Sequence, residues 1–301
     1  MSERTDIYKI VEKVEALNPL HAKKLRDNLS QMDATFFEWS KEFLAKYQQF
    51  LDKTGVSMEE AITFYLDKVH ENIFEMVHFF QTGKYRYTSF QEVNERVYAR
   101  SEVMNSYLYG LLLSQALWKQ HFAMFQFFSA NLNQFNTNGK YLEIGGGHGL
   151  FIDAATKIFG SKIEYTCLDI SQTALSVARE FIDFPSVNFI HSNIFDFNPA
   201  QAFQFISMGE VLEHVEKPLE LLIKLNQILT DDGTAFITVP TNAPDIDHIY
   251  LFNNTQEIKD LISLAGFSII KEIEVPTENY SVEISHQKKI CVMYAAFLKK
   301  I

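Results

Sequence analysis

Two patterns of hydrophobic spacing divide the chain. From residue 1 to about 136, apolar side chains recur every three or four positions, as in Ile62, Tyr65, Leu66, Val69 and Ile73. This spacing places them on one face of a helix. We therefore expect an all-α region over residues 1–136.

Glycine, proline and capping residues mark where the helices of this region end. The breaks fall near Pro19, Gly55 and Gly83. Ser57, followed three residues later by Glu60, matches a capping box at the start of a helix.

From residue 137 onward, short apolar runs alternate with amphipathic ones. The predicted strands are 140–144, 163–170, 187–193, 203–209, 234–240, 267–275 and 288–300, and the predicted helices are 150–159, 171–182, 218–229 and 255–266. Such alternation is typical of α/β proteins, in which helices cover both faces of a mostly parallel sheet. The polar, turn-rich stretch 131–139 predicts a boundary between a helical domain, 1–136, and an α/β domain, 137–301.

Composition excludes several classes of function. The formal net charge is −11 and the basic residues occur as isolated pairs, which argues against a nucleic-acid partner. No run approaches the roughly 18 apolar residues that predict a membrane span, and the first fifteen residues lack the apolar core of a signal peptide. Cys167 and Cys291 lie in apolar runs, where we expect free thiols. These features predict a cytoplasmic protein with no membrane partner.

A glycine-rich turn and a carboxylate suggest a nucleotide-like ligand. Gly145, Gly146, Gly147 and Gly149 follow the strand at 140–144, and glycines there allow a ligand to approach the backbone. Asp169 ends the next strand, where a carboxylate accepts hydrogen bonds from a ribose. The spacing differs from the dinucleotide fingerprint and favours another nucleoside-containing cofactor.

The motif E-x-G-x-G-x-G, with an acidic residue ending the second strand, resembles the class I S-adenosylmethionine-dependent methyltransferases. The resemblance implies a Rossmann-like, seven-stranded sheet whose last strand is antiparallel. It implies that the cofactor's amino-acid moiety lies among Glu143, Gly145, Gly147 and Gly149, its ribose at Asp169 and its adenine near Asn193. The family often has Asp where this chain has Asn193. Ile170, Ile194 and Gly209 complete the predicted cofactor site.

A second cluster follows the strand at 203–209. Glu210, Glu213 and His214 share one face if they form a helical turn, and two carboxylates with an imidazole suit a divalent ion. With His248 on the loop after the fifth strand, the pattern is similar to coenzyme Q biosynthesis O-methyltransferases and plant small-RNA 2′-O-methyltransferases. That resemblance implies metal ligation by Glu210, Glu213, His214 and His248, with His214 and His248 also catalytic; the ion would be Mg²⁺, Mn²⁺, Fe²⁺ or Zn²⁺. The small-RNA enzymes have a second histidine where this chain has Val215.

Other readings of these histidines and acids stay open. His214 can instead serve as the base of a metal-free O- or N-methyltransferase, or be structural. Asp245 and Asp247 are expected in a loop turn. His148 is expected either to contact the substrate or cofactor or to be exposed to solvent.

The expected reaction is O-methylation of a small molecule whose hydroxyl chelates the ion. An inactive cofactor-binding partner subunit is the remaining alternative. The aromatic stretch 107–128 is expected to line an apolar pocket, form a helix–helix dimer interface or fill an ordinary core, and its His121 is expected to be a satisfied core or interface residue. We expect a homodimer through the helical domain.

Overall fold

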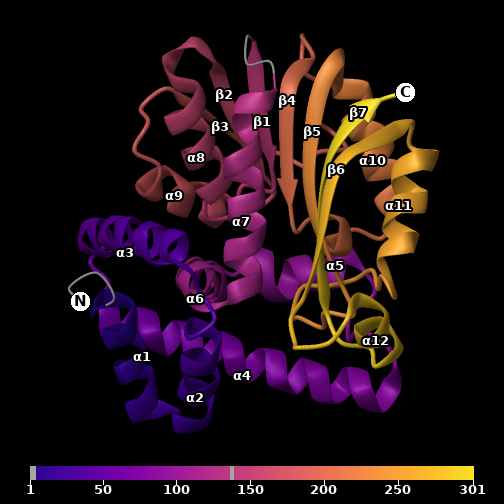
Figure 1. Cartoon of the computed structure of the whole chain (residues 1–301). Helices are drawn as coiled ribbons and strands as arrows, with labels where there is room; N and C mark the ends of the chain where they lie inside the picture. The colour runs from indigo at the N-terminus through magenta and orange to yellow at the C-terminus, as the bar shows by residue number, and fades with distance from the viewer. Residues whose placement is uncertain (1–4, 136–138) are drawn as a thin grey trace.

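The computed structural model describes residues 5–135 and 139–301. A layer of helices lies against one end of a seven-stranded sheet (Figure 1). The helices of the N-terminal half are α1 (Thr5–Leu17), α2 (Pro19–Leu29), α3 (Ala34–Thr54), α4 (Met58–Thr82), α5 (Phe90–Val93), the π-helical turn η1 (Asn94–Tyr98), α6 (Ser101–Leu117), α7 (Lys119–Asn131) and the 3₁₀ turn η2 (Leu132–Gln134). The proposed domain boundary at residues 136–137 lies outside the described residues.

The helix ends follow the local chemistry of the sequence. Asn18 caps α2, and Gly55 and Gly83 end α3 and α4 in the left-handed conformation. The capping box of Ser57 and Glu60 forms as predicted. The all-α character of this region is confirmed.

The second half of the chain forms the sheet and its covering helices. Its elements are β1 (Lys140–Ile144), α8 (Leu150–Phe159), η3 (Gly160–Lys162), β2 (Glu164–Asp169), α9 (Gln172–Phe181), β3 (Val187–His191), β4 (Phe203–Gly209), η4 (Leu212–His214), α10 (Pro218–Ile228), β5 (Leu229–Thr241), α11 (Thr255–Leu264), β6 (Phe267–Pro276), α12 (Val282–Gln287) and β7 (Val292–Lys300).

The strand order is β3-β2-β1-β4-β5-β7-β6, and β7 runs antiparallel to both neighbours. This confirms the predicted seven-stranded, Rossmann-like α/β sheet. Strand β5 begins earlier than predicted: between the pairs Phe203–Leu229 and Phe205–Thr234 the expected turn at 231–233 becomes a bulge within the strand. The last strand is shorter than the predicted 288–300 and begins at Val292, because residues 288–291 form the turn and connection that follow α12.

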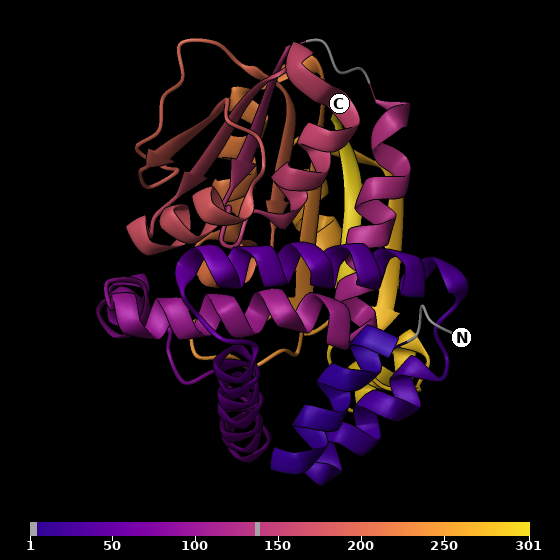
Figure 2. The same ribbon diagram turned by 90° about the vertical axis from the view of Figure 1, so that its left-hand side faces the viewer.

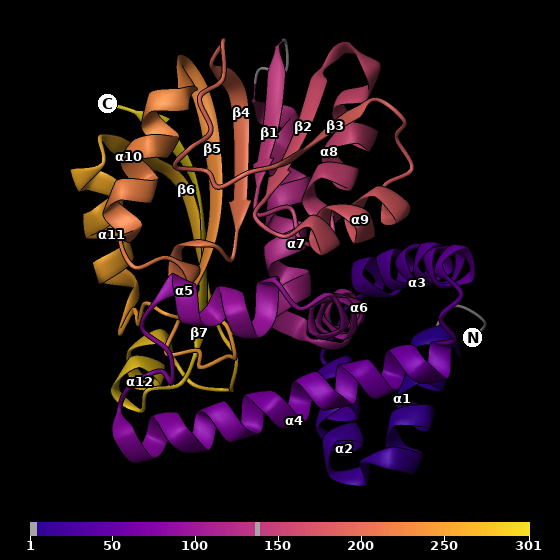
Figure 3. The ribbon, with the colours of Figure 1, turned by 180° about the vertical axis from the view of Figure 1, so that it is seen from behind.

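Alternate strand residues face two separate cores. Leu142 and Ile206 lie in a core with residues of α10 and α11. Tyr141 and Phe205 lie in a second core that continues into the N-terminal helices. Figures 2 and 3 show these helices next to the sheet. One sheet face and the helical layer therefore share a single core.

The carboxyl ends of the parallel strands point toward the helical layer (Figure 1). Ligands of open α/β sheets bind at these ends. Within residues 5–135 and 139–301, no helix has the length and hydropathy needed to cross a membrane.

Candidate functional site

The glycine turn after β1 is held close to its neighbours. Gly145 has φ 65°, and its N–H donates to the Leu168 carbonyl at 2.8 Å. A Cβ on Gly146 would lie 2.2 Å from the Cys167 sulfur on β2. The turn therefore requires glycine, since one position is left-handed and the other touches the next strand.

Asp169 fastens this turn to β2. One carboxylate oxygen accepts the Gly147 N–H at 2.9 Å and the other the Ser171 N–H at 2.8 Å. Burial raises the pKa of the carboxyl, and these two hydrogen bonds oppose the shift.

Glu143 lies beside the same turn with an unsatisfied oxygen. Its Oε2 is buried without a partner among the described residues. Burial raises the pKa of this carboxyl well above its usual value. A buried carboxylate oxygen without a donor is a position where a ligand can supply one.

One cavity of about 1140 Å³ joins the strand ends to the helical layer. This exceeds the roughly 300–1,000 Å³ of a typical small-molecule pocket, so a cofactor and an acceptor fit together. Its lining includes these predicted site residues: Glu143, Gly145, Gly147, Asp169, Ile170, Asn193, Ile194, Gly209, Glu210, His214 and His248. Gly149 is not among them and instead lies at the start of α8. Glu213 lies behind the wall, fully buried.

Two other residues of the predicted cofactor side have assigned contacts. Asn193 Oδ1 accepts the Phe195 N–H at 3.0 Å, which fixes the turn after β3. His148 lines the cavity, and burial lowers the pKa of its ring to about 4.

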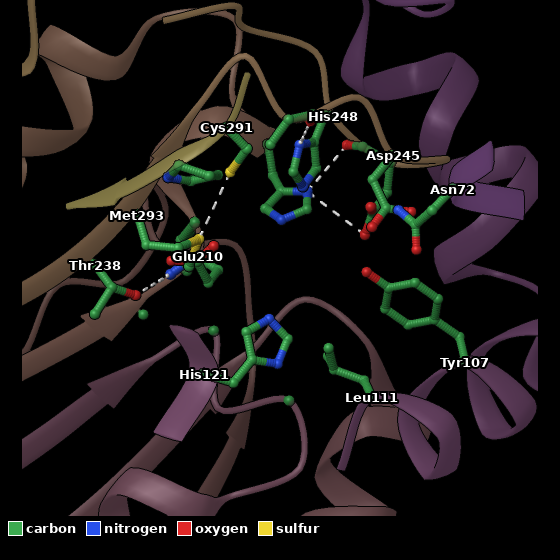
Figure 4. A pocket seen from close by; sticks show the side chains of 18 of the residues that line it. Asn72, Tyr107, Leu111, His121, Glu210, Thr238, Asp245, His248, Cys291 and Met293 are labelled. Carbon is green, nitrogen blue, oxygen red and sulfur yellow. Dashed lines mark hydrogen bonds and ion pairs between the residues drawn. The ribbon is translucent and has the colours of Figure 1, made fainter. Parts of the chain in front are cut away.

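The opposite wall comes from the helical layer. Helices α4, α6 and α7 contribute Lys68, Asn72, Met76, Tyr107, Leu108, Leu111, Gln115, His121 and Met124. Figure 4 shows Asn72, Tyr107, Leu111 and His121 surrounding the cavity with Glu210, Asp245 and His248. The aromatic stretch 107–128 thus lines the pocket with one side, while Phe122 and Phe128 fill the core.

His121 has hydrogen-bond partners, as expected of a satisfied histidine, but its ring lines the cavity. Its Nδ1 lies 2.9 Å from the Ser114 hydroxyl, and burial lowers the pKa of the ring to about 3. The ring lines the cavity in neutral form. The packing of α6 against α7 places His121 at the cavity, and the spacing of residues along the sequence does not reveal this packing.

The turn after β4 is not the regular helical turn that the sequence predicts. Glu210 has φ 54°, which is strained for a residue with a side chain, and its N–H donates to Thr238. Only Leu212–His214 form a 3₁₀ turn. Glu210 therefore does not reach the cluster of Glu213 and His214 through helical spacing; a left-handed backbone turns it toward the cavity.

Glu213, His214 and His248 converge. Glu213 Oε1 lies 3.6 Å from His214 Nε2 and 3.9 Å from His248 Nε2. Neither Glu213 oxygen has a hydrogen-bond partner among the described residues, and one Glu210 oxygen is likewise buried and unpaired. Burial raises the pKa of Glu213 well above its usual value, and Glu210 raises it further. A cation at this position would satisfy these oxygens.

Both imidazoles present Nε2 to Glu213 because Nδ1 is bound elsewhere. His248 Nδ1 donates to the Ala243 carbonyl at 2.5 Å, and His214 Nδ1 to the Asp247 carbonyl at 2.9 Å. A carbonyl acceptor on one ring nitrogen fixes the tautomer that leaves the other free to bind a metal. Burial lowers the pKa of His248 to about 4, which keeps this ring neutral.

Two further residues lie at this site: Asp247, which the sequence places in a loop turn, and Tyr98, which the sequence does not single out. Asp247 is 3 % exposed, and its Oδ2 lies 3.5 Å from His214 Nδ1. The Tyr98 hydroxyl lies 3.0 Å from that nitrogen and donates to Asp247 Oδ2 at 3.4 Å. The π-helical turn that ends at Tyr98 was a possible signal, since such turns often mark functional sites, but it is visible only in the structure.

A family model described as a methyltransferase domain matches residues 117–272, just over half of the chain. The chain belongs to this methyltransferase family. Membership confirms the predicted relation to class I S-adenosylmethionine-dependent methyltransferases.

Individual methyltransferases are more distant. A ubiquinone biosynthesis O-methyltransferase from Glaesserella parasuis is 27% identical over 156 residues, which cover 48% of this chain and 60% of the relative. This chain therefore spans less than two thirds of that relative's length.

Among solved structures, the N-methyltransferase NodS from Bradyrhizobium japonicum, in complex with S-adenosyl-L-homocysteine, is 14% identical. The match covers 70% of this chain and 97% of that chain, with a TM-score of 0.49. An S-adenosylmethionine-dependent methyltransferase from Aquifex aeolicus is 18% identical over 56% of this chain and 88% of that chain, with a TM-score of 0.44.

Proposed function

We propose that this protein transfers a methyl group from S-adenosylmethionine to a hydroxyl of a small molecule that chelates a divalent metal. Glu143 and the glycine turn would hold the amino-acid end of the cofactor, and Asp169 its ribose. The sulfonium of S-adenosylmethionine would supply the methyl group. Family membership and the unpaired oxygen of Glu143 support this cofactor assignment.

The convergence of the unpaired Glu213 carboxylate with two Nε2 atoms carries the metal proposal. Glu210, Glu213, His214 and His248 would hold the ion, and its charge would lower the pKa of a bound hydroxyl. The oxygen and nitrogen donors suit Mg²⁺, Mn²⁺, Fe²⁺ or Zn²⁺.

The remaining tasks fall to the chain itself. The Ala243 and Asp247 carbonyls orient the two imidazoles. Leu108, Leu111 and Met124 give the helical wall an apolar surface that excludes water from the reacting groups.

Replacing His248 with Ala tests the proposal. Loss of a residue that only hydrogen-bonds to a metal ligand typically weakens metal binding roughly 10–100-fold, so loss of a ligand should lower the metal content of the purified protein further. Turnover on a panel of catechols, hydroxamates and α-hydroxy acids should fall with it. His70→Ala, an exposed position on α4, is the matched control. Wild-type turnover by His248→Ala in the presence of a chelator would refute the metal proposal.

One contact favours a metal-free alternative. The Asp247 carboxylate lies 3.5 Å from His214 Nδ1, an arrangement that also orients a histidine acting as general base. In that case turnover of the wild type would be unaffected by chelators, while His214→Ala would abolish it.

A further inference from the structure

Two clusters of metal-binding side chains share His248. The described residues place Glu213, His214 and His248 in one group and Asp245, Asp247 and His248 in another, with the ligand atoms of each group within 4.8 Å of one another. Because His248 Nδ1 donates to the Ala243 carbonyl, only Nε2 is available. One nitrogen cannot bind two ions, so only one of the two groups can use His248 for an ion, and together they offer more carboxylates than one ion needs.

Glu213 and Asp245 differ in whether their carboxylate oxygens are already bound, whereas Asp247 of the second group also keeps one buried, unpaired oxygen among the described residues. Both oxygens of Glu213 are unpaired among the described residues. Those of Asp245 are occupied: Oδ2 lies 2.8 Å from Lys68 Nζ, and Oδ1 accepts the Ile246 N–H at 2.8 Å. Asp245 is therefore held in an arrangement that satisfies it without a metal.

Lys68 reaches this loop from the helical layer. It lies on α4, is 3 % exposed, and its ammonium sits 4.1 Å from the centre of the Tyr107 ring. One turn further along α4, the Asn72 amide donates to the Pro244 carbonyl at 3.4 Å. A buried lysine is costly unless it is paired, so its presence beside Asp245 needs a reason.

The number of ligands supplies that reason. Glu210, Glu213, His214 and His248 are four side chains, and a six-coordinate ion keeps two positions for the two donor atoms of a chelating acceptor. A further ligand from Asp245 would take one of these positions.

We propose that Lys68 is a positioning residue that pairs with Asp245, keeps this carboxylate off the metal and so leaves a position open for the acceptor. The inference rests on the proposed metal site. In it, the helical layer shapes the metal site through a side chain that pairs with Asp245 and does not contact the metal.

Cobalt(II) is a suitable probe, because its visible absorption reports the number and geometry of its ligands. Lys68→Met should bind Co²⁺ no more weakly than the wild type but with a changed spectrum. Acetohydroxamate, a small bidentate chelator, should alter the wild-type spectrum and require at least about tenfold more ligand to alter that of Lys68→Met. Lys68→Met with Asp245→Asn should restore the wild-type behaviour, because the amide is a poor metal ligand.

Lys46→Met is the matched control. Lys46 is a largely buried lysine that joins α3 to Asp153 of α8, and neither residue lines the cavity. Its loss should lower stability and leave the Co²⁺ spectrum unchanged. Thermal unfolding and binding of S-adenosylhomocysteine identify variants that fail to fold.

The outcomes separate the two proposals. If the folded wild type takes up no Co²⁺, the metal site itself is wrong. If the wild type binds Co²⁺ and Lys68→Met gives the same spectrum and acetohydroxamate response, or binds Co²⁺ more weakly while folded, the role of Lys68 is wrong.

Discussion

At the scale of single residues, buried acids without partners are the most informative feature of the molecule. Glu143, Glu210 and Glu213 each have an oxygen that is buried and unpaired among the described residues. Such groups destabilise a folded protein unless a ligand or ion completes them. Glu143 and Glu210 line the cavity and Glu213 lies behind its wall, which indicates that stability is given up for binding.

Glu143→Gln separates these two effects. Burial raises the pKa of Glu143 above its ordinary value of 4.5 in the folded state, so the folded protein retains a proton that the unfolded chain releases. The free energy of unfolding of the wild type therefore falls as the pH rises above about 4.5, and it stops falling once the pH has passed the folded-state pKa. The variant lacks this loss, and its advantage in urea unfolding without cofactor should grow from pH 5 to pH 8.

Binding should move in the opposite direction. Losing a charge-assisted hydrogen bond of about 1.5–3 kcal/mol should weaken the binding of S-adenosylhomocysteine to the variant by roughly 10–100-fold at pH 8. Calorimetry measures this affinity. Glu164→Gln, an exposed carboxylate on β2, is the control. Equal affinity of Glu143→Gln and the wild type would remove Glu143 from the cofactor site.

The residue types of the site could be predicted from sequence, but several of their contacts could not. Glu143 and Asp169 lie near the ends of β1 and β2, while His214 and His248 follow β4 and β5, and the family resemblance pointed to these positions. Lys68 was not predictable, because its partner is Asp245, 177 positions away. Such contacts depend on tertiary packing rather than on spacing.

At the scale of elements, the strand-to-helix turn determines the cavity floor. Its glycines were predictable from the sequence because they interrupt an apolar run. The sequence could not show why position 146 needs glycine, because the reason is the closeness of Cys167 on the neighbouring strand. Likewise, the left-handed Glu210 stands where a helical turn was expected, directly after β4 ends at Gly209.

Gly146→Ala should disrupt this turn. The added methyl group would lie 2.2 Å from the Cys167 sulfur, so the turn must shift away from β2 and cofactor binding should be lost. Adding Cys167→Ala removes the sulfur and should recover most of the binding and of the melting temperature. Cys167→Ala alone measures the cost of the cavity. Failure of the double variant to recover would show that another contact requires glycine here.

At the scale of the whole molecule, the fold class followed from the alternation of strands and helices, and the antiparallel last strand from the resemblance to the methyltransferase family. The relation of the two halves did not. The division at 136–137 remains a prediction, and the homodimer does too. One observation bears on the dimer: Phe74, Val77 and Phe80, at helical spacing on α4, are 70%, 50% and 57% exposed.

Replacing Phe74 and Val77 with Glu tests the dimer. If the apolar end of α4 joins two copies, sedimentation velocity should show a dimer for the wild type and a monomer for the double variant, because two buried charges would oppose association. Leu264→Glu, 70% exposed on α11, is the control and should stay dimeric. A wild type that sediments as a monomer at all concentrations would contradict the prediction.

The core shared by the helical layer and one sheet face also limits how this enzyme can be re-engineered. Exchanging residues 5–135 for the equivalent part of a relative would separate Phe50 from Phe181 and Phe128 from Phe236, ring contacts that join the two halves. A chimaera would therefore expose apolar surface and misfold. New acceptor preferences are better sought by replacing individual side chains along the cavity wall.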